Sequence, residues 1–408
     1  MSAATQQEPQ APKAPDHVPN DLIRRFDFRH DPAMELDPWA RFSQLNDAPD
    51  IFYSLDQGGY WAITRKSIIE EVLAKPVLFS SAFNSIPRIE SDFRLIPPNL
   101  DPPDHAKYRN IINTRIFNPK VLATIEQDAR AIIRELIAAK KPAGHGDFVA
   151  DFARPFPVAV FLKLMGMPTN RLAEFSDDID QFFRGEDVEK VGAARMAVFR
   201  FAQEWLDSDP SAENAHILRE LKAADIEGRP LTGEELTIMV LTLFFAGLDT
   251  VTAQMSFIAQ FLATHPDHRD RLVVEPALIP NAIEEMMRRF GIANLCRLVT
   301  EDTELHGVIM RKGDLVMVSS TMAGVDERSY ADAMTVNFDR PSIKNHCGFG
   351  KGIHACAGQR LARIELSVLL EEVLSTLKNL RLAPGAEIRF LPGTIMSMRS
   401  LPVVWDIA

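Results

Sequence analysis

The chain is poor in cysteine, with Cys296, Cys347 and Cys356 as its only three among 408 residues. Three cysteines cannot build a disulfide framework, so a buried core has to stabilise the fold, and a reducing compartment is expected. No run of about 18 apolar residues without charge occurs, so we expect no membrane span. The first 20 residues lack a basic stretch followed by an apolar one, so they resemble a disordered lead-in and not a signal peptide. We therefore expect a cytoplasmic location.

Basic residues are also in deficit, at 45 Lys and Arg against 56 Asp and Glu, which gives a net charge of −11. This balance argues against nucleic acid as the main partner, because phosphate binding requires a basic surface. The hydrophobic share of 46% and the charged share of 25% are those of an ordinary globular protein. No linker or repeat interrupts the chain after residue 20, so we expect one domain over 21–408, as a monomer.

Helical spacing dominates, with short strand patterns between the helices. Residues 51–64 are typical of a β-hairpin, and Asp101 is placed to cap a helix. A long apolar helix is expected over 232–265, opened by a capping box and stopped by a proline. Residues 306–320 suggest a pair of strands joined by a turn. The pattern predicts a mostly helical fold with small β-sheets.

The stretch "FGKGIHACAG", residues 349–358, places one cysteine in a glycine-rich turn before a helix. Zinc could be considered, because His346, Cys347, His354 and Cys356 lie close in sequence, but their spacing is not that of usual zinc pairs. Neither phosphate-loop pattern is met. A thiolate ligand to haem iron fits better, because a helix N-terminus favours negative charge and should lower the pKa of the thiol. A structural cysteine in a capping turn remains open.

This stretch resembles the cysteine signature of the cytochrome P450 family, F-x-x-G-x-x-x-C-x-G, with Phe349, Gly352, Cys356 and Gly358 at its fixed positions. Two further marks of that family precede it in the expected order. One is "FFAGLDTVT" in the long helix, and the other is Glu285-x-x-Arg288, followed by "FDRP" at 338–341. The resemblance implies a triangular, mainly α-helical fold with small β-sheets and a long central helix over the haem.

The resemblance also implies roles for individual residues. Cys356 would be the axial ligand of haem b, Asp249 and Thr250 would deliver protons to dioxygen, and Glu285 with Arg288 would be structural. The haem would be held by a set of residues on several segments: His105, Arg109, Arg297 and His354 at its two carboxylates, and Ala246, Phe349, Gly350 and Gly358 beside it. Arg184 is expected to pair with Asp249. Leu295 stands where the family has an acid near a carboxylate of the haem.

Similarity to the bacterial camphor-hydroxylase group extends along the chain and suggests a substrate pocket. Its expected residues are small, apolar or aromatic: Phe93, Phe183, Thr242, Phe245, Ala246, Ala293, Thr394 and Ile395. Phe93 replaces a tyrosine whose hydroxyl holds the camphor ketone, so the pocket should be poor in donors. We therefore expect hydroxylation of a small hydrophobic terpenoid, with a cineole- or ionone-like compound favoured over camphor.

No reductase domain is attached, so the resemblance implies electrons from a [2Fe–2S] ferredoxin and its reductase. A basic patch around the cysteine loop would receive the acidic ferredoxin: Lys107, Arg109, Lys344, Lys351, Arg360 and Arg363. A non-catalytic haem-thiolate sensor or carrier is the alternative function. The Asp249–Thr250 pair argues against it, because a sensor needs no proton delivery. A zinc-binding structural protein is the third possibility.

Overall fold

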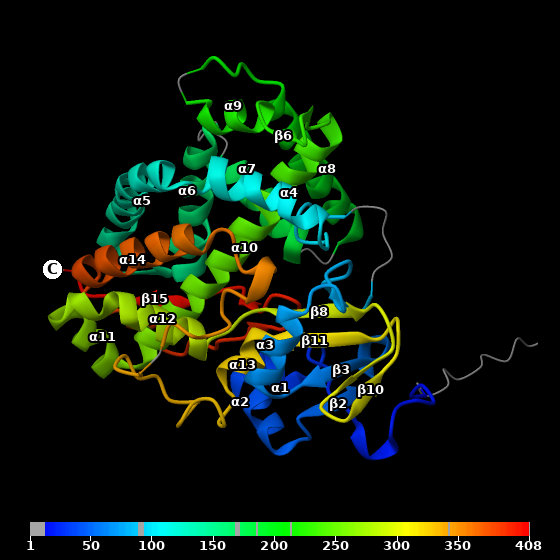
Figure 1. Cartoon of the computed structure of the whole chain (residues 1–408). Coiled ribbons are helices and arrows are strands. Elements are labelled where there is room, and N and C mark those ends of the chain that lie inside the picture. Colours follow the sequence, from blue (N-terminus) through cyan, green and yellow to red (C-terminus); the bar gives the residue numbers. More distant parts are fainter. Residues whose placement is uncertain are drawn as a thin grey trace, which may run out of the picture.

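A computed structural model describes residues 13–88, 94–167, 172–184, 187–212, 214–341 and 343–407, with side chains of the helix at 172–184 described for 175–182. In Figure 1 the helices α4 to α9 gather in the upper part of the molecule, and strands β2, β3, β8 and β11 lie in the lower part beside α1, α2, α3 and α13. Helix α10 runs through the middle between them. The expectation of a mainly helical fold with small β-sheets is confirmed.

The helices vary from one turn to nearly nine. They are α1 (Pro32–Leu36), α2 (Pro38–Ser43), α3 (Lys66–Ala74), α4 (Asp104–Ile111), α5 (Pro119–Lys140), α6 (Pro155–Met165), α7 (Leu172–Arg184), α8 (Val188–Leu206), α9 (His216–Lys222), α10 (Gly233–Thr264), α11 (Pro266–Val274), α12 (Ile279–Arg289), α13 (Ser320–Gly324) and α14 (Gln359–Thr376). Helix α14 packs on α5 and on α12, so the segment after the cysteine loop is held from two sides.

The largest sheet has six strands in the order β1-β2-β3-β11-β8-β4. Its members are β1 (Ile23–Arg24), β2 (Ile51–Ser54), β3 (Tyr60–Ile63), β4 (Phe79–Ser80), β8 (Asn294–Val299) and β11 (Leu315–Ser319). Smaller sheets pair β9 (Thr303–Leu305) with β10 (Val308–Met310), β13 (Phe390–Leu391) with β14 (Ser397–Met398), and β6 (Asp225–Ile226) with β7 (Arg229–Pro230). The last joins β5 (His145–Asp147), β15 (Pro402–Val404) and β12 (Arg381–Leu382).

Helix α10 forms as the sequence predicts. Its N-cap is Thr232, whose hydroxyl accepts a hydrogen bond from the Glu235 amide while the Glu235 carboxylate accepts from the Thr232 amide. By length and composition alone this helix could cross a membrane, yet over half of its most apolar stretch is buried inside the protein. It is the central core helix of the fold and carries "FFAGLDTVT" at its middle.

Two local expectations are wrong. Asp101 does not cap α4, because its carboxylate accepts hydrogen bonds from the Ser80 hydroxyl and the Ser81 amide, and α4 begins after Pro103 without a side-chain cap. The strands within 306–320 exist but do not pair with each other. Strand β10 pairs with β9, whereas β11 pairs with β8 and β3. The predicted hairpin at 51–64 is confirmed by the antiparallel pairing of β2 with β3.

The predicted lead-in covers residues 1–20, of which residues 1–12 lie outside the described residues. The described end of this segment contacts the turn before β11. His17 Nε2 lies 2.8 Å from the Asp314 carboxylate, and Val18 is buried.

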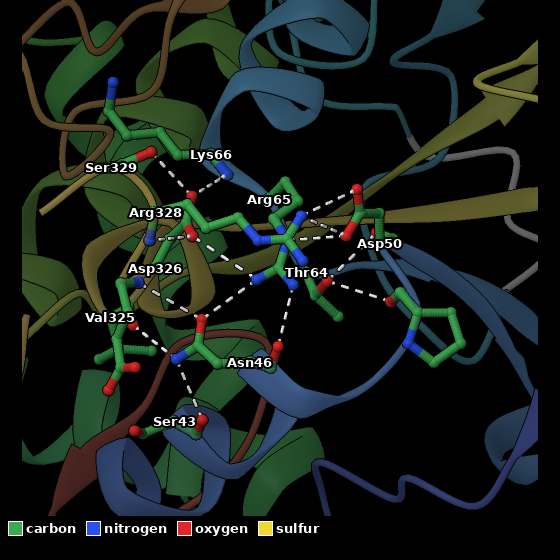
Figure 2. A network of polar contacts seen from close by, with 12 residues as sticks. Ser43, Asn46, Asp50, Thr64, Arg65, Lys66, Val325, Asp326, Arg328 and Ser329 are labelled. Atoms are coloured by element: carbon green, nitrogen blue, oxygen red, sulfur yellow. Dashed lines mark hydrogen bonds and ion pairs between the residues drawn. The ribbon is translucent and has the colours of Figure 1, made fainter.

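A buried polar network joins the start of α3 to the loop after α13 (Figure 2). The Asp326 carboxylate accepts from the Lys66 amide at 2.9 Å, from the Arg328 amide at 3.2 Å and from the Ser329 hydroxyl at 2.8 Å. Arg65 lies 3.6 Å from it and also pairs with Asp50 at 2.8 Å. The network ties the sheet to the loop that supports the Glu285–Arg288 pair described below.

Removing the carboxylate at the centre of this network should destabilise the fold. We expect Asp326→Ala to lower the free energy of unfolding by about 1–3 kcal/mol, because buried donors lose their acceptor. Urea denaturation of the variant and the wild type measures the difference. Asp16→Ala, which removes an exposed ion pair with Lys13, should cause no measurable change, and an equal loss in both variants would contradict the assigned role.

Candidate active site

A cavity of about 830 Å³ lies against the middle of α10 and gathers the described residues of the expected cofactor site and substrate pocket. Its wall includes residues from both the expected cofactor site and the expected substrate pocket: His105, Arg109, Thr242, Phe245, Ala246, Asp249, Thr250, Ala293, Leu295, Arg297, Phe349, Gly350, His354, Cys356, Gly358, Thr394 and Ile395. These residues come from segments up to 290 positions apart, so the fold brings the separate motifs to one place.

Cys356 stands two residues before the cap of α14 and presents its sulfur to this cavity. Its amide donates to the Phe349 carbonyl at 2.8 Å, which closes the loop, and its side chain is exposed in the cavity wall. Burial raises the pKa of the Cys356 thiol, and the Gly358 amide and the charge of Arg109 oppose this only in part. The amide at the start of α14 does lower this pKa, as the sequence predicts, but burial outweighs its effect. A bound metal cation reverses that balance, because a coordinating thiol is deprotonated.

Two positions of the cysteine loop require glycine for different structural reasons. Gly352 has φ of 67°, and a Cβ there would lie 2.5 Å from the Leu73 carbonyl of α3, so only glycine fits. The close approach that requires glycine here is to the protein backbone of α3. Gly350 also needs its positive φ of 68°, but a Cβ there would meet nothing closer than 3.9 Å, so the space beside Phe349 stays open toward the cavity.

Cations and hydrogen-bond donors gather beside Cys356, and no acid among the described residues forms an ion pair with them. The rings of His105 and His354 lie 4.2 Å apart, and the Nε2 atom of each is buried with no hydrogen-bond partner. Burial, followed by the charges of Arg297, His105 and Arg109, lowers the pKa of His354 to about 3. Arg297 is buried, and within the described part of the chain its guanidinium donates only to the Cys296 carbonyl. Buried donors without acceptors are costly, so this cluster fits a ligand that brings acid groups, such as the two carboxylates of haem.

The middle of α10 opens onto the same cavity. Ala246 is exposed although it lies within a buried helix, because it faces the cavity. The Thr250 hydroxyl donates to the Ala246 carbonyl at 2.8 Å, so its oxygen is left as an acceptor toward the cavity. Asp249 is buried in the same wall. Its expected partner Arg184 has a side chain outside the described residues.

The expected substrate wall is assembled by the tip between β13 and β14. The Asn294 amide donates to the Thr394 carbonyl at 2.7 Å, and Ala293 forms a β-bridge with Ile395. On the opposite side Phe245 stacks on Phe182 with ring centroids 4.6 Å apart. Phe183 and Phe93, which are also expected in this wall, have side chains outside the described residues.

The described cavity wall also carries polar groups, while Phe93, on which the expectation of few donors rests, lies outside the described residues. The Thr242 hydroxyl and the side-chain amide nitrogen of Gln254 are both buried without a hydrogen-bond partner. Arg29 and Asn84 also line the cavity, and neither was found from sequence. Glu365 is a further missed residue: its carboxyl group is fully buried in the wall, and burial raises its pKa well above the usual range. None of these residues belongs to a local motif.

Glu285 and Arg288 form a completely buried ion pair, 2.7 Å apart. Arg288 also donates to the carbonyls of Gly324 and Ala333, and Arg340 of "FDRP" reaches the Glu285 carboxylate at 3.0 Å. The pair therefore holds the loop before the cysteine stretch against α12. It does not line the cavity, as expected for a structural element.

A second buried cluster lies under the cysteine loop and was not expected. The Glu284 carboxylate lies 2.5 Å from Arg363 and 3.1 Å from Nε2 of His346. The Gly348 amide donates to Nδ1 of His346, so the Nε2 atom carries the proton that bonds Glu284. The Arg363 guanidinium lies over the Phe349 ring, 4.4 Å from its centroid. Glu284 thus holds His346, which precedes Phe349, and Arg363 of α14, which lies over the Phe349 ring.

Burial would raise the pKa of Glu284, but hydrogen bonds from His346 and Arg363 lower it to about 2. A carboxylate with a folded pKa below its unfolded value of about 4.5 stabilises the fold above pH 4.5, and this stabilisation disappears as the pH falls toward 2. Glu284→Gln should therefore lose about 1.5–3 kcal/mol at pH 7 and show a weaker decline toward pH 3 than the wild type. Urea unfolding across this pH range measures both effects. Glu301→Gln, at an exposed position, should match the wild type, and parallel profiles for all three proteins would contradict the prediction.

The expected ferredoxin-binding residues are mostly engaged within the protein. Arg363 pairs with Glu284, and Arg109 donates to the Ala355 carbonyl. Lys107 pairs with Asp104 and Glu227, and Lys351 with Asn345 and Glu70. Among the described residues only Lys344 and Arg360 of this set are exposed without an ion pair. The zinc alternative has no support in the described part of the chain, where no three His, Cys, Asp or Glu side chains form a metal-binding group.

Known proteins share both the sequence and the fold. The family model "Cytochrome P450" matches residues 185–392. The "Probable cytochrome P450 127A1" of Sinorhizobium fredii is 32% identical over 96% of both chains. The "Steroid C26-monooxygenase" of Mycolicibacterium smegmatis is 29% identical over 94% of this chain and 96% of its own. The crystal structure of cytochrome P450 CYP101C1 superposes with a TM-score of 0.89 at 30% identity and covers 97% of this chain and 100% of its own.

The match extends over more than half of the chain in the family model and over nearly all of it in the relatives. It agrees with the fold, with the cavity under α10 and with the cysteine at its wall. This chain therefore belongs to the cytochrome P450 family and is a bacterial haem-b monooxygenase that uses dioxygen.

Proposed function

We propose that Cys356 is the haem ligand and that the enzyme hydroxylates an unactivated C–H bond of a small, largely apolar terpenoid. The observation that carries the site assignment is the donor cluster beside Cys356, where His105 and His354 keep buried nitrogens without partners. Those two residues, with Arg109 and Arg297, would hold the haem carboxylates. When bound, haem supplies the redox chemistry of oxygen activation, and thiolate ligation favours O–O cleavage.

The remaining residues of the wall would control protons, water and orientation. Thr250 presents an acceptor oxygen to the cavity and Asp249 lies one residue away, so together they would hold a proton source beside the reacting oxygen. Phe245, Ala293 and Ile395 would exclude water and orient the substrate. The small-terpenoid assignment is supported by the size of the cavity, which has to admit haem and substrate together, and by these apolar side chains.

Electrons would come from a [2Fe–2S] ferredoxin with its reductase. Because Lys107, Lys351 and Arg363 are paired with acids, Lys344 and Arg360 would make the main charged contacts with an acidic partner.

Absorption spectra of the holoenzyme test the proposal in two steps. The reduced protein with carbon monoxide should show the Soret band of a thiolate-bound haem. Titration of the ferric protein with cineole, ionone, camphor and a long-chain fatty acid should then give the largest spin-state shift with a terpenoid. Absence of the thiolate band would reject Cys356 as ligand, and a larger shift with the fatty acid would reject the substrate class.

A further inference from the structure

Arg29 places a positive charge in the cavity wall at a point away from the haem-binding cluster. It lies between β1 and α1, and its Nη1 atom donates to the Ile86 carbonyl at 2.9 Å and to the Thr394 hydroxyl at 3.2 Å. Its hydrogen bonds reach none of the four residues assigned to the haem carboxylates. Arg29 therefore belongs to the substrate wall, which Thr394 and Ile395 build with Ala293.

The guanidinium of Arg29 has unused donors in a specific arrangement. Arginine carries five N–H groups, and the two hydrogen bonds of Arg29 both use Nη1. The donors on Nε and Nη2, which form the fork that binds a carboxylate with two parallel bonds, have no partner among the described residues. The Thr394 hydroxyl accepts from Arg29, so its own proton remains available on the same side.

No acid of the described chain neutralises Arg29. Asp27, two residues earlier, accepts from Gln57 and His30 and from the amide of residue 29, not from its guanidinium. Asp31 is paired with Arg41 at 2.7 Å. A partly buried cation without a counter-charge is costly, so its position in a substrate pocket indicates a ligand that supplies the negative charge.

We propose that Arg29, with the hydroxyl of Thr394, binds a carboxylate of the substrate. The preferred substrates are then compact apolar skeletons that bear one carboxylate group. The carboxylate lies at the Arg29 side of the cavity, and the apolar body extends toward Thr250 and Ala246. This inference rests on the proposed function and narrows its substrate class from small, largely apolar terpenoids to those that carry a carboxylate.

The test compares acids with uncharged partners of the same skeleton, by calorimetric titration of the ferric holoenzyme at pH 7.5. One pair is perillic acid and perillyl alcohol, and a second, non-terpenoid pair is 4-tert-butylbenzoic acid and 4-tert-butylbenzyl alcohol. The wild type should bind each acid at least about tenfold more tightly than its alcohol, because hydrogen bonds to charged groups are the stronger ones. Arg29→Met should weaken acid binding about tenfold to a hundredfold and change alcohol binding less than threefold.

Two further variants separate binding from structural effects. Arg29→Lys keeps the charge but loses the fork, so it should retain part of the preference for acids. Arg25→Met removes an exposed arginine of the same segment, paired with Asp56, and should behave as wild type. Equal binding of acid and alcohol by the wild type, or an unchanged acid affinity in Arg29→Met, overturns the inference. If only the benzoate pair shows the preference, the role of Arg29 stands and the terpenoid assignment fails.

Discussion

Replacing Cys356 with serine is expected to remove the thiolate Soret band of the reduced carbon-monoxide complex and to lower product formation by more than about 100-fold. Loss of an outer residue that only supports a metal ligand already costs about 10- to 100-fold, so loss of the ligand itself should exceed this range. Serine keeps the shape of the side chain, but its hydroxyl does not ionise near neutral pH. The electron donation that favours O–O cleavage would be lost. Absorbance and product yield with a fixed ferredoxin supply measure both effects.

Cys296→Ser is the matched control. Cys296 is fully buried, its thiol donates to the carbonyls of Phe83 and Ser85, and burial raises its pKa to about 12. A serine hydroxyl can make the same donations, so the spectrum and activity should remain those of the wild type. A thiolate band that persists in Cys356→Ser, or disappears in Cys296→Ser, would show that Cys356 is not the ligand.

The features that sequence predicted well depend on residues close together in the chain. The capping box of Thr232 and Glu235, the hairpin at 51–64 and the turn around Cys356 all follow from local spacing and are present in the structure. The errors concern partners that lie far away. Asp101 is used by Ser80 and Ser81 instead of a helix end, and β10 and β11 each find partners in different sheets. Local rules cannot anticipate such competition.

Burial and distant counter-charges explain the remaining differences. The pKa of Cys356 is raised because the thiol lies inside a cavity that distant segments enclose, and sequence does not reveal that enclosure. Arg363 looks like a surface cation until Glu284, 79 positions away, is found beside it. Arg29 carries no motif at all, and its place in the cavity depends on contacts with Ile86 and Thr394. The substrate-determining residues are therefore the least predictable part of this site.

Asp249→Asn is expected to slow product formation by about 100-fold or more, because a positioned acid–base group typically contributes 10²–10⁴-fold. Asparagine has the same shape and also forms hydrogen bonds, but it carries no titratable proton. Substrate affinity and the carbon-monoxide spectrum should therefore stay unchanged, which separates the change from misfolding or loss of haem. Turnover in water and in deuterium oxide provides the measurement, and the solvent isotope effect should rise as proton delivery becomes limiting.

Asp326→Asn supplies the comparison for this variant, since Asp326 is also a buried aspartate but lies in the network under α3, outside the cavity wall. It should leave turnover and the isotope effect as in the wild type.

The geometry of α10 adds a reason to expect that Asp249→Asn slows turnover and Asp326→Asn does not. The Thr250 hydroxyl is committed to the Ala246 carbonyl, so it can accept a hydrogen bond but has no free proton to supply. Proton delivery would then use a neighbouring acid–base group, and Asp249 is the adjacent residue in the wall. Wild-type turnover in Asp249→Asn would exclude that route and favour a non-catalytic role for the pair.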